Sequence, residues 1–353
     1  MKAGKLPSDL LARLLARLPA DPRLLLGPGI GHDAAAIDLG EGRVLVAKAD
    51  PVTFATEQIG RYAVHVNAND VACLGARPAW FMATVLLPEG ASEELAEQIF
   101  EQVRSACEEL GVVPVGGHTE ITLGLERPII AGAMLGETTR EALVRPDGAQ
   151  AGDHLVLTKG IALEGTALLA RDAPQALRAR GVPQATIEAA AELLVRPGIS
   201  VVREALAACR AALSGERPET SPSRFVHALH DPTEGGLATA LVELEQAAGL
   251  SVRLRREDVP ILPETAAVCD ALRLDPLGLL ASGALLIAVA PPGCEAVCDT
   301  VRAEGIAATC IGELASGEEG AIMDNQNAEP LPRFERDELA RFLESLDEGS
   351  TER

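Results

Sequence analysis

The chain has 353 residues, enough for two domains or one large one at ~100–200 residues per domain. Its formal net charge of −21 repels phosphate backbones and anionic lipid headgroups, so we expect no nucleic-acid or membrane partner. Hydrophobic residues make up 47% of the chain and aromatic residues only 2%, which predicts a large aliphatic core. Because the chain shows neither an apolar run of the ~20 residues that cross a membrane nor an N-terminal signal pattern, the expected location is cytoplasmic.

In the first half of the chain, apolar residues follow helical and extended patterns in turn. Helices are expected at 7–19, around Asp70 and at 92–110, and strands at 44–47, 80–87, 112–115 and 128–135. Glycine-rich loops are expected at 27–31 and directly after the strand at 112–115.

A stretch rich in Pro, Asp and Gly at 146–152 indicates a boundary between domains of residues 1–148 and 149–318. Residues 319–353 are expected to form a polar tail with one helix at 334–346, and residues 214–224 a surface loop. The expected strands of the second half are 154–157, 225–229, 251–255 and 284–290, and the expected helices are 162–171, 185–195, 199–213, 234–248 and 293–304. Strands and helices mixed in both halves predict an α/β or α+β fold.

The seven cysteines are scattered, and only Cys294 and Cys298 lie close together in the sequence. No second close pair completes a four-ligand zinc motif. We therefore expect reduced thiols in a cytosolic protein.

An Asn69-Asp70 pair lies inside an apolar helical pattern that stops at Gly75, with Pro78 beyond. A carboxylate on such a helix is costly to bury unless a metal or another cation pairs with it. Asp70 therefore either faces solvent or belongs to a site, and further acidic segments favour the site.

Four segments combine a strand or loop end with an acidic residue, and two of them hold glycine. They are 31–35 with Asp33, 48–51 with Asp50, the Asn69-Asp70 pair, and 230–236 with Asp231. Carboxylates that converge from separate segments suit Mg²⁺, whose shell nucleotide phosphates complete. Glycines, as in Gly116-Gly117 before His118, let backbone N–H groups approach phosphate oxygens. Each segment alone is more often a turn or a bend, so only the combination favours a nucleotide–metal site.

Together and in this order, these segments resemble the ATP-dependent superfamily of aminoimidazole ribonucleotide (AIR) synthase, over about residues 25 to 315. The run from Asp231 to Ala238 resembles the Asp-Pro-Thr-x-Gly-Gly-Leu-Ala signature of the HypE hydrogenase maturation factors. The phrase Leu-Asp-Pro-Leu at 274–277 also fits the HypE pattern. The resemblance implies a two-domain PurM-like fold with an ATP-binding N-terminal domain. It also implies a homodimer formed through the N-terminal sheet, and ATP and Mg²⁺ as cofactors.

The resemblance also implies roles for individual residues. Those expected to hold Mg²⁺ are Asp33, Asp50 and Asp70. Those expected to bind ATP are Gly31, Asp33, Lys48, Asp50, Asn69, Asp70, Gly116 and Gly117. Those expected in catalysis are Asp70, Asp231 and His118, with Asp231 near the acceptor. The implied reaction is phosphoryl transfer to a carbamoyl or amide group on a partner protein, or to a small metabolite. Such catalysis is mostly positioning and charge neutralisation.

Two features depart from the HypE pattern. HypE carries a C-terminal cysteine that receives the carbamoyl group, but no cysteine follows Cys310 in this chain. Ser282 stands where the HypE phrase Asn-Glu-Gly has its glutamate. The resemblance is therefore to a HypE-like protein that does not modify its own tail.

Histidines accompany the motif segments. His32 and His118 stand where many relatives have aspartate, His65 precedes the Asn-Asp pair, and His230 precedes Asp231. They either bind phosphate, transfer protons or ligate a softer metal than Mg²⁺, or they only form hydrogen bonds that structure the loops. For His65, on the apolar helix, the structural interpretation is favoured.

Two lysines have similar alternatives. Lys48, at a position that is often threonine in relatives, either contacts a phosphate or pairs with Asp50. Lys159, before Gly160, is either a surface lysine or part of a phosphate-binding turn.

Three functions remain open. The first is an ATP- and Mg²⁺-dependent phosphoryl-transfer enzyme acting on an amide, carbamoyl or small-metabolite acceptor. The second is a small-molecule kinase of the thiamine-monophosphate kinase type. The third is a non-catalytic ATP-binding maturation or scaffold protein.

Overall fold

The computed structural model describes residues 6–53, 57–214, 225–317, 320–324 and 327–351. It divides into two compact units, Met1–Leu143 and Val144–Arg353. Of the surface loop expected at 214–224, all but Ser214 lies outside the described residues. None of the described helices is both long and apolar enough to cross a membrane.

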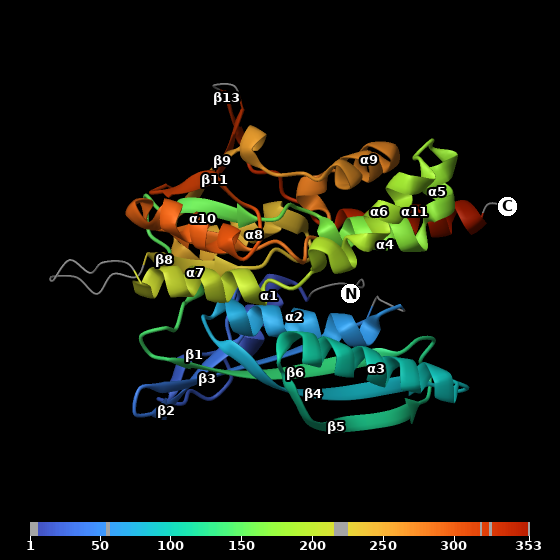
Figure 1. Cartoon of the computed structure of the whole chain (residues 1–353), viewed down its shortest axis with the longest axis horizontal. Helices are drawn as coiled ribbons and strands as arrows, with labels where there is room; N and C mark the ends of the chain where they lie inside the picture. The colour runs from blue at the N-terminus through green and yellow to red at the C-terminus, as the bar shows by residue number, and fades with distance from the viewer. Residues whose placement is uncertain (1–5, 54–56, 215–224, 318–319, 325–326, 352–353) are drawn as a thin grey trace. The chain divides into compact units, whose positions relative to one another are not determined.

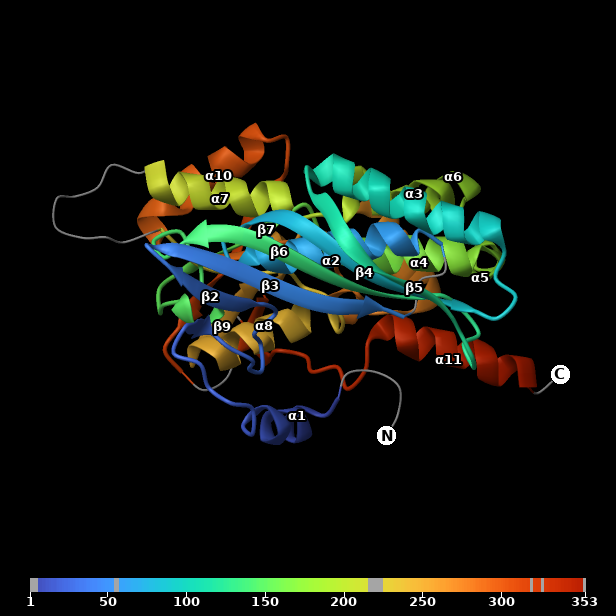
Figure 2. The same ribbon diagram turned by 90° about the horizontal axis from the view of Figure 1, so that it is seen from below.

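The first unit is built on a six-stranded sheet in the order β1-β2-β3-β6-β4-β5. Its strands are β1 (Leu24–Leu26), β2 (Ala35–Gly40), β3 (Arg43–Val52), β4 (Arg77–Pro88), β5 (Val113–Thr122) and β6 (Ile129–Thr139). Its helices are α1 (Ser8–Leu15), α2 (Ile59–Cys73) and α3 (Glu93–Leu110). Neighbouring strands are antiparallel except β4 and β5, which run parallel. Helices α2 and α3 cover one face of this sheet (Figure 1), and the long strands β3, β6 and β4 lie side by side (Figure 2).

Helix α2 is buried along nearly its whole length, because it packs on β3, β4 and β6 as well as on α3. Asn67 anchors it to the sheet: its Nδ2 donates to the carbonyl of Asp50 at 3.2 Å and to that of Ala63 at 2.8 Å. A Cβ at Gly132 on β6 would lie 2.5 Å from Asn67 Nδ2, so glycine permits this close packing. The contacts fix the rotation of α2 and therefore the position of Asp70.

The glycine segment 116–120 forms no loop, which corrects the expectation from sequence. Strand β5 continues through Gly116, Gly117 and His118 to Thr122, in parallel register with β4. Gly117 has a φ of +153°, and a Cβ there would lie 2.0 Å from the carbonyl oxygen of Ala83 on β4. Close strand pairing is therefore a sufficient reason for glycine at this position.

The second unit contains a seven-stranded sheet in the order β13-β12-β9-β11-β7-β10-β8. Its strands are β7 (His154–Thr158), β8 (Val226–His230), β9 (Ser251–Arg255), β10 (Leu286–Val289), β11 (Ala308–Ala315), β12 (Ala321–Asp324) and β13 (Asn327–Pro330). Its α-helices are α4 (Leu163–Asp172), α5 (Pro174–Ala179), α6 (Gln184–Glu192), α7 (Val202–Ser214), α8 (Gly236–Ala248), α9 (Pro263–Leu272), α10 (Cys294–Ala303) and α11 (Glu338–Thr351). Short helical turns are η1 (Pro146–Gly148), η2 (Leu194–Gly198), η3 (Arg256–Asp258), η4 (Pro276–Gly278) and η5 (Pro291–Gly293). Aliphatic side chains of the sheet and of the helices form one core, as the composition predicts.

The segment expected as a polar tail contains two strands and a helix. Strand β12 pairs in parallel with β9, and β13 pairs with β12. Leu331 and Phe342 are buried in the core of the second unit. These few apolar residues attach a largely polar segment to the unit. The average composition of the segment does not show them, so it predicted only a polar tail.

Replacing Gly117 with alanine is expected to destabilise the protein by about 1–3 kcal/mol, because the new Cβ would overlap the Ala83 carbonyl. Gly116→Ala is the matched control, since its φ is nearly the same and its Cβ would meet nothing within 4 Å. Urea denaturation of both variants measures the difference. Equal losses of stability would show that contact with Ala83 is not what requires glycine.

Candidate functional site

A buried ion pair lies where helix α2 crosses strand β3. Lys48 Nζ lies 2.8 Å from Asp70 Oδ2 and 3.5 Å from Asp50 Oδ2. The side chain of Asp70 is 5% exposed and that of Lys48 15%, so α2 and the sheet shield this pair from water. Lys48 and Asp50 are two residues apart on β3 and therefore face the same side of the sheet.

The pKa of Lys48 depends on the acidic residues around it. Burial by itself lowers the pKa of Lys48, but the charges of Asp70 and Asp50 and the hydrogen bond to Asp70 raise it above its ordinary value. The charge of Asp33 contributes in the same direction. Two of the three carboxylates expected to form one site therefore pair with this ammonium, and the charge of the third, Asp33, also acts on it.

The donor chemistry of this cluster fits Mg²⁺. Carboxylate oxygens are the hard ligands that Mg²⁺ prefers. Three carboxylates against one ammonium leave two formal negative charges, which a divalent cation would balance. Asp33, Asp50 and Asp70 are the residues that would hold it.

Two asparagines flank this cluster on α2. Asn69, expected to bind ATP, is fully buried beside Asp70. Asn67 escaped the sequence analysis, although it lies three residues before Asp70 and therefore on the same face of the helix. That spacing of two polar residues on an apolar helix was the available signal.

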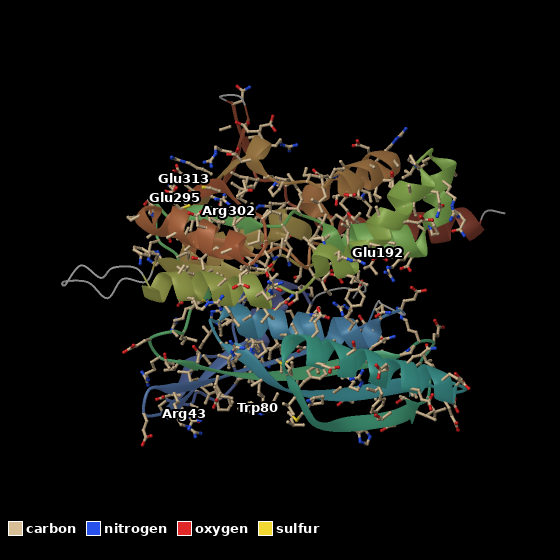
Figure 3. All side chains as sticks on the ribbon, viewed as in Figure 1. Arg43, Trp80, Glu192, Glu295, Arg302 and Glu313 are labelled. Atoms are coloured by element: carbon tan, nitrogen blue, oxygen red, sulfur yellow. The ribbon has the colours of Figure 1, made fainter. Side chains whose placement is uncertain are left out.

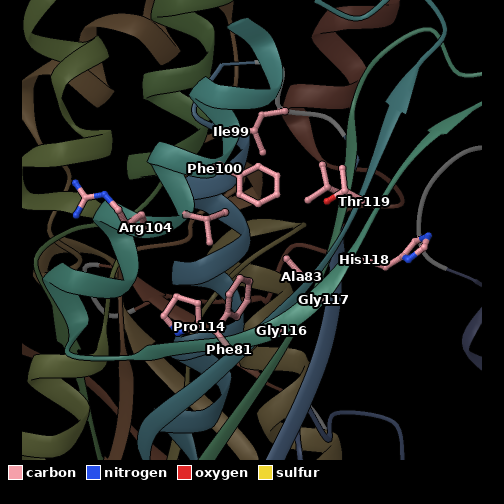
Figure 4. Close-up of a pocket in the computed structure, with 12 residues that line it drawn as sticks. Phe81, Ala83, Ile99, Phe100, Arg104, Pro114, Gly116, Gly117, His118 and Thr119 are labelled. Atoms are coloured by element: carbon pink, nitrogen blue, oxygen red, sulfur yellow. The ribbon is translucent and has the colours of Figure 1, made fainter. Parts of the chain in front are cut away.

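Gly116, Gly117 and His118 lie apart from the Lys48 cluster within this unit. Strand β5 is separated from β3 by β6 and β4, which at ~4.8 Å per strand amounts to ~14 Å. The three residues help to line a pocket of about 310 Å³ beneath α3. Figure 4 shows the His118 ring directed away from Ile99 and Phe100 in this pocket. The side chain of His118 is 66% exposed, and its Nε2 lies 3.3 Å from Glu120. Its role in catalysis stays a prediction.

Two histidines of the first unit, His32 and His65, make structural contacts. His32 Nδ1, next to Gly31, lies 2.9 Å from the carbonyl oxygen of Gly27 and closes the loop before β2. His65 is fully buried on α2, and its Nε2 lies 3.9 Å from Glu109. Both contacts favour the structural interpretation over metal ligation.

The second unit buries an acidic group around Asp231, which directly follows β8. Glu164, at the start of α4, accepts a hydrogen bond from Ser282. Burial, and then the charges of Asp337 and Asp231, raise the pKa of Glu164 to about 7 although this hydrogen bond lowers it. A carboxyl group is therefore present beside Ser282, where sequence reasoning found an acidic residue missing.

Asp337 organises the glycine motif that follows Asp231. Its Oδ2 accepts a hydrogen bond from the Gly235 N–H at 2.6 Å, and its Oδ1 accepts from Leu280 at 3.3 Å and Leu339 at 2.8 Å. Gly235 and Gly236 both have positive φ at the start of α8, which favours glycine. Asp337 was missed because it lies about a hundred residues further along the chain, in the segment expected as a polar tail.

Lys159 takes neither of the two positions expected for it. It is buried, with Nζ 2.7 Å from Glu204 and within 3.3 Å of the carbonyl oxygens of Gly198, Ser200 and Gly283. These acceptors satisfy the three N–H donors of the ammonium and leave none for a phosphate. Lys159 therefore links three segments of the second unit.

The raised pKa of Glu164 predicts a pH-dependent stability. An acid whose folded pKa exceeds its unfolded value of 4.5 stabilises the fold at low pH and loses that contribution as the pH rises toward 7. Relative to Glu164→Gln, the wild type should therefore lose roughly 3 kcal/mol of unfolding free energy between pH 4.5 and 8. Urea denaturation across this range measures it.

Glu192→Gln is the matched control, because Glu192 is exposed on the same unit (Figure 3). Its stability relative to the wild type should not change over the same range. If the difference between the wild type and Glu164→Gln were also independent of pH, the buried acid would have an ordinary pKa.

Both halves of the chain match known protein families. The profile of the AIR synthase related protein, N-terminal domain, matches residues 31–138, and that of the C-terminal domain matches residues 150–325. The carbamoyl dehydratase HypE of Rhizobium leguminosarum bv. viciae is 27% identical, with 86% of each chain covered. The selenide, water dikinase of Paraburkholderia xenovorans (strain LB400) is 30% identical, with 89% of this chain and 91% of that protein covered.

A crystal structure of the hydrogenase maturation protein HypE in complex with ATP has the same fold. Its TM-score is 0.65 at 24% identity, with 94% of this chain and 96% of that chain covered. The expected two-domain PurM-like fold is thereby confirmed. This chain belongs to the family of AIR synthase related proteins.

Proposed function

We propose that this protein is an ATP- and Mg²⁺-dependent phosphoryl-transfer enzyme that activates an amide, carbamoyl or small-metabolite acceptor. The observation that carries the proposal is the pairing of Lys48 with Asp70 and Asp50, with the charge of Asp33 acting on the same ammonium. Such a group matches what phosphoryl transfer asks of a protein, which is to position phosphates and neutralise their charge.

Each residue of this cluster has a definite task in the proposed reaction. Mg²⁺ held by the three carboxylates would neutralise charge on the ATP phosphates. Lys48 balances the charge of the buried Asp70, and its ammonium would contact the ATP phosphates. Asn69, which is buried next to Asp70 on α2, would help to hold the ATP phosphates.

Asp231 is proposed to act on the acceptor side. It belongs to the buried acidic group of the second unit, where Glu164 has a pKa near 7 and can exchange a proton at neutral pH. A HypE relative crystallised in complex with ATP supports the nucleotide part of the proposal.

A small-molecule kinase is the second candidate. The relative named as a dikinase is 30% identical over most of its length, and this chain has no cysteine after Cys310. A non-catalytic ATP-binding scaffold is the third. Turnover of ATP separates the scaffold from the enzymes, and the identity of the phosphorylated product separates the enzymes from each other.

Asp70→Asn is expected to lower ATP turnover by at least ~100-fold, since it removes a charge on which Mg²⁺ and Lys48 depend. Lys48→Met should also lower turnover strongly. Asp21→Asn and Arg43→Met are matched controls, because these exposed residues form ion pairs of the first unit away from the cluster. The measurement is ADP formation with amide, carbamoyl and small-metabolite acceptors, alongside calorimetric ATP binding.

Two results would contradict the proposal. If Asp70→Asn kept wild-type turnover, the cluster would not be the ATP site. If the wild type bound ATP tightly but did not turn it over with any of the acceptors, the protein would be a scaffold.

We also propose a homodimer formed through the first sheet. Strand β5 ends this sheet, so one of its backbone edges has no neighbouring strand within the described part of the unit. The strand is exposed almost throughout and carries Val113, Val115 and Ile121, which are all more than half exposed. An edge that is both apolar and open is a surface that proteins normally cover.

Ile121→Lys is expected to convert the dimer to a monomer, because a lysine charge would be buried at the contact. Leu39→Lys, at an exposed apolar position on β2 across the same sheet, should leave the dimer intact. Light scattering after size-exclusion chromatography measures the mass of each variant. A wild-type monomer, or a dimer unaffected by Ile121→Lys, would contradict this interface.

A further inference from the structure

Three potential metal ligands meet in the second unit, within the part of the chain that the structure describes. The ring of His154 and the sulfurs of Cys294 and Cys310 offer ligand atoms that all lie within 4.8 Å of one another. Ligands at ~2.3 Å from a tetrahedral zinc ion lie ~3.8 Å apart. The three side chains are therefore close enough to share one ion after small rotations.

Cys298 lies beside this group of three and is the fourth candidate ligand. Its thiol shares a hydrogen bond with that of Cys294, which also shares one with Cys310. Cys294 opens α10 and Cys298 follows one helical turn later, so both sulfurs project from one face of the helix. Three thiols and one imidazole make the Cys₃His set that zinc sites in proteins use.

The fold brings these ligands together from distant parts of the sequence. His154 begins β7 and Cys310 lies on β11, which are adjacent antiparallel strands of the sheet. A bulge lies between Cys310 and Gly312 and shifts the register of the two strands at this point. Helix α10 packs against both strands, with Glu295 and Arg302 on its outer surface (Figure 3).

The surroundings suit bound thiolates. Arg255 Nη2 lies 3.6 Å from Cys310 Sγ and donates to the Cys310 carbonyl at 3.0 Å. A nearby guanidinium favours the ionised form of a thiol, and the thiolate is the form that binds metal. Cys298 is buried and the other two cysteines are half-buried, which limits competing water while leaving a route for an incoming ion.

We propose that His154, Cys294, Cys298 and Cys310 form a binding site for a thiophilic divalent cation of the Zn²⁺ class. Soft sulfur and imidazole ligands select such an ion over Mg²⁺. The bound ion links β7, α10 and β11, and it stabilises the fold of the second unit. Sequence spacing does not reveal this set, because only Cys294 and Cys298 among its members lie close together in the chain.

The test is zinc content of the full chain after incubation with Zn²⁺ and dialysis, measured by mass spectrometry of the metal. The wild type should hold about one ion per chain, and Cys310→Ser and Cys294→Ser should hold much less. Cys209→Ser is the matched control, since it also removes one thiol of the second unit but lies on α7 outside the cluster. Co²⁺ in place of Zn²⁺ should give the visible and thiolate charge-transfer bands of a tetrahedral site.

Alkylation of the wild-type chain gives a second readout that does not depend on the folding of variants. The three cluster cysteines should react slowly in zinc-loaded protein and quickly after chelation. The alkylation rate of Cys209 should be the same in both states. Zinc content equal in wild type and Cys310→Ser would overturn the proposal. So would protection of two of these cysteines that a reductant, but not a chelator, removes, because those two thiols would then form a disulfide.

Discussion

The pairing of one buried carboxylate with one ammonium governs the first unit. Asp70 lies on a helix packed against a sheet, where an unpaired charge would cost several kcal/mol. Lys48, on the strand beneath, removes that cost at a distance of 2.8 Å. Asn67 ties the same helix to the backbone of the same strand, so the geometry of the pair is held at two points.

The second unit meets the same constraint with different chemistry. Lys159 and Glu204 form a buried pair whose cation is further held by backbone carbonyls. No cation among the residues that the structure describes pairs with Glu164, and burial, with the charges of Asp337 and Asp231, raises its pKa to about 7, which favours its neutral form. One unit therefore pairs its central acid with an ammonium, and the other favours the neutral form of its buried acid. This difference suits binding of a charged nucleotide in the first unit and proton exchange with an acceptor in the second.

The sequence predicted what depends on neighbouring residues and missed what depends on distant ones. The helix around Asp70 and the strand that leads to Asp50 follow from local periodicity, whereas β2, just after Asp33, was not predicted. The charges of all three carboxylates act on one ammonium. The strand conformation of Gly116 and Gly117 depends on a carbonyl of β4, about thirty residues earlier in the chain. The roles of Asp337 and Lys159 likewise depend on partners tens to more than a hundred residues away. No local pattern encodes such contacts.

Oxygen ligands and sulfur or imidazole ligands lie in different units of the protein, and this bears on which metal the histidines near the motifs could bind. Histidine in place of aspartate at position 32 suggested a softer metal at the carboxylate cluster, but His32 is engaged with a backbone carbonyl. The carboxylates of the first unit thus remain a hard oxygen set. The soft ligands gather instead at His154 and three cysteines of the second unit, where no motif of the family signature lies. Because hard and soft ligands are kept in separate units, each site selects its own cation, and a structural zinc ion need not compete with the Mg²⁺ that accompanies a nucleotide.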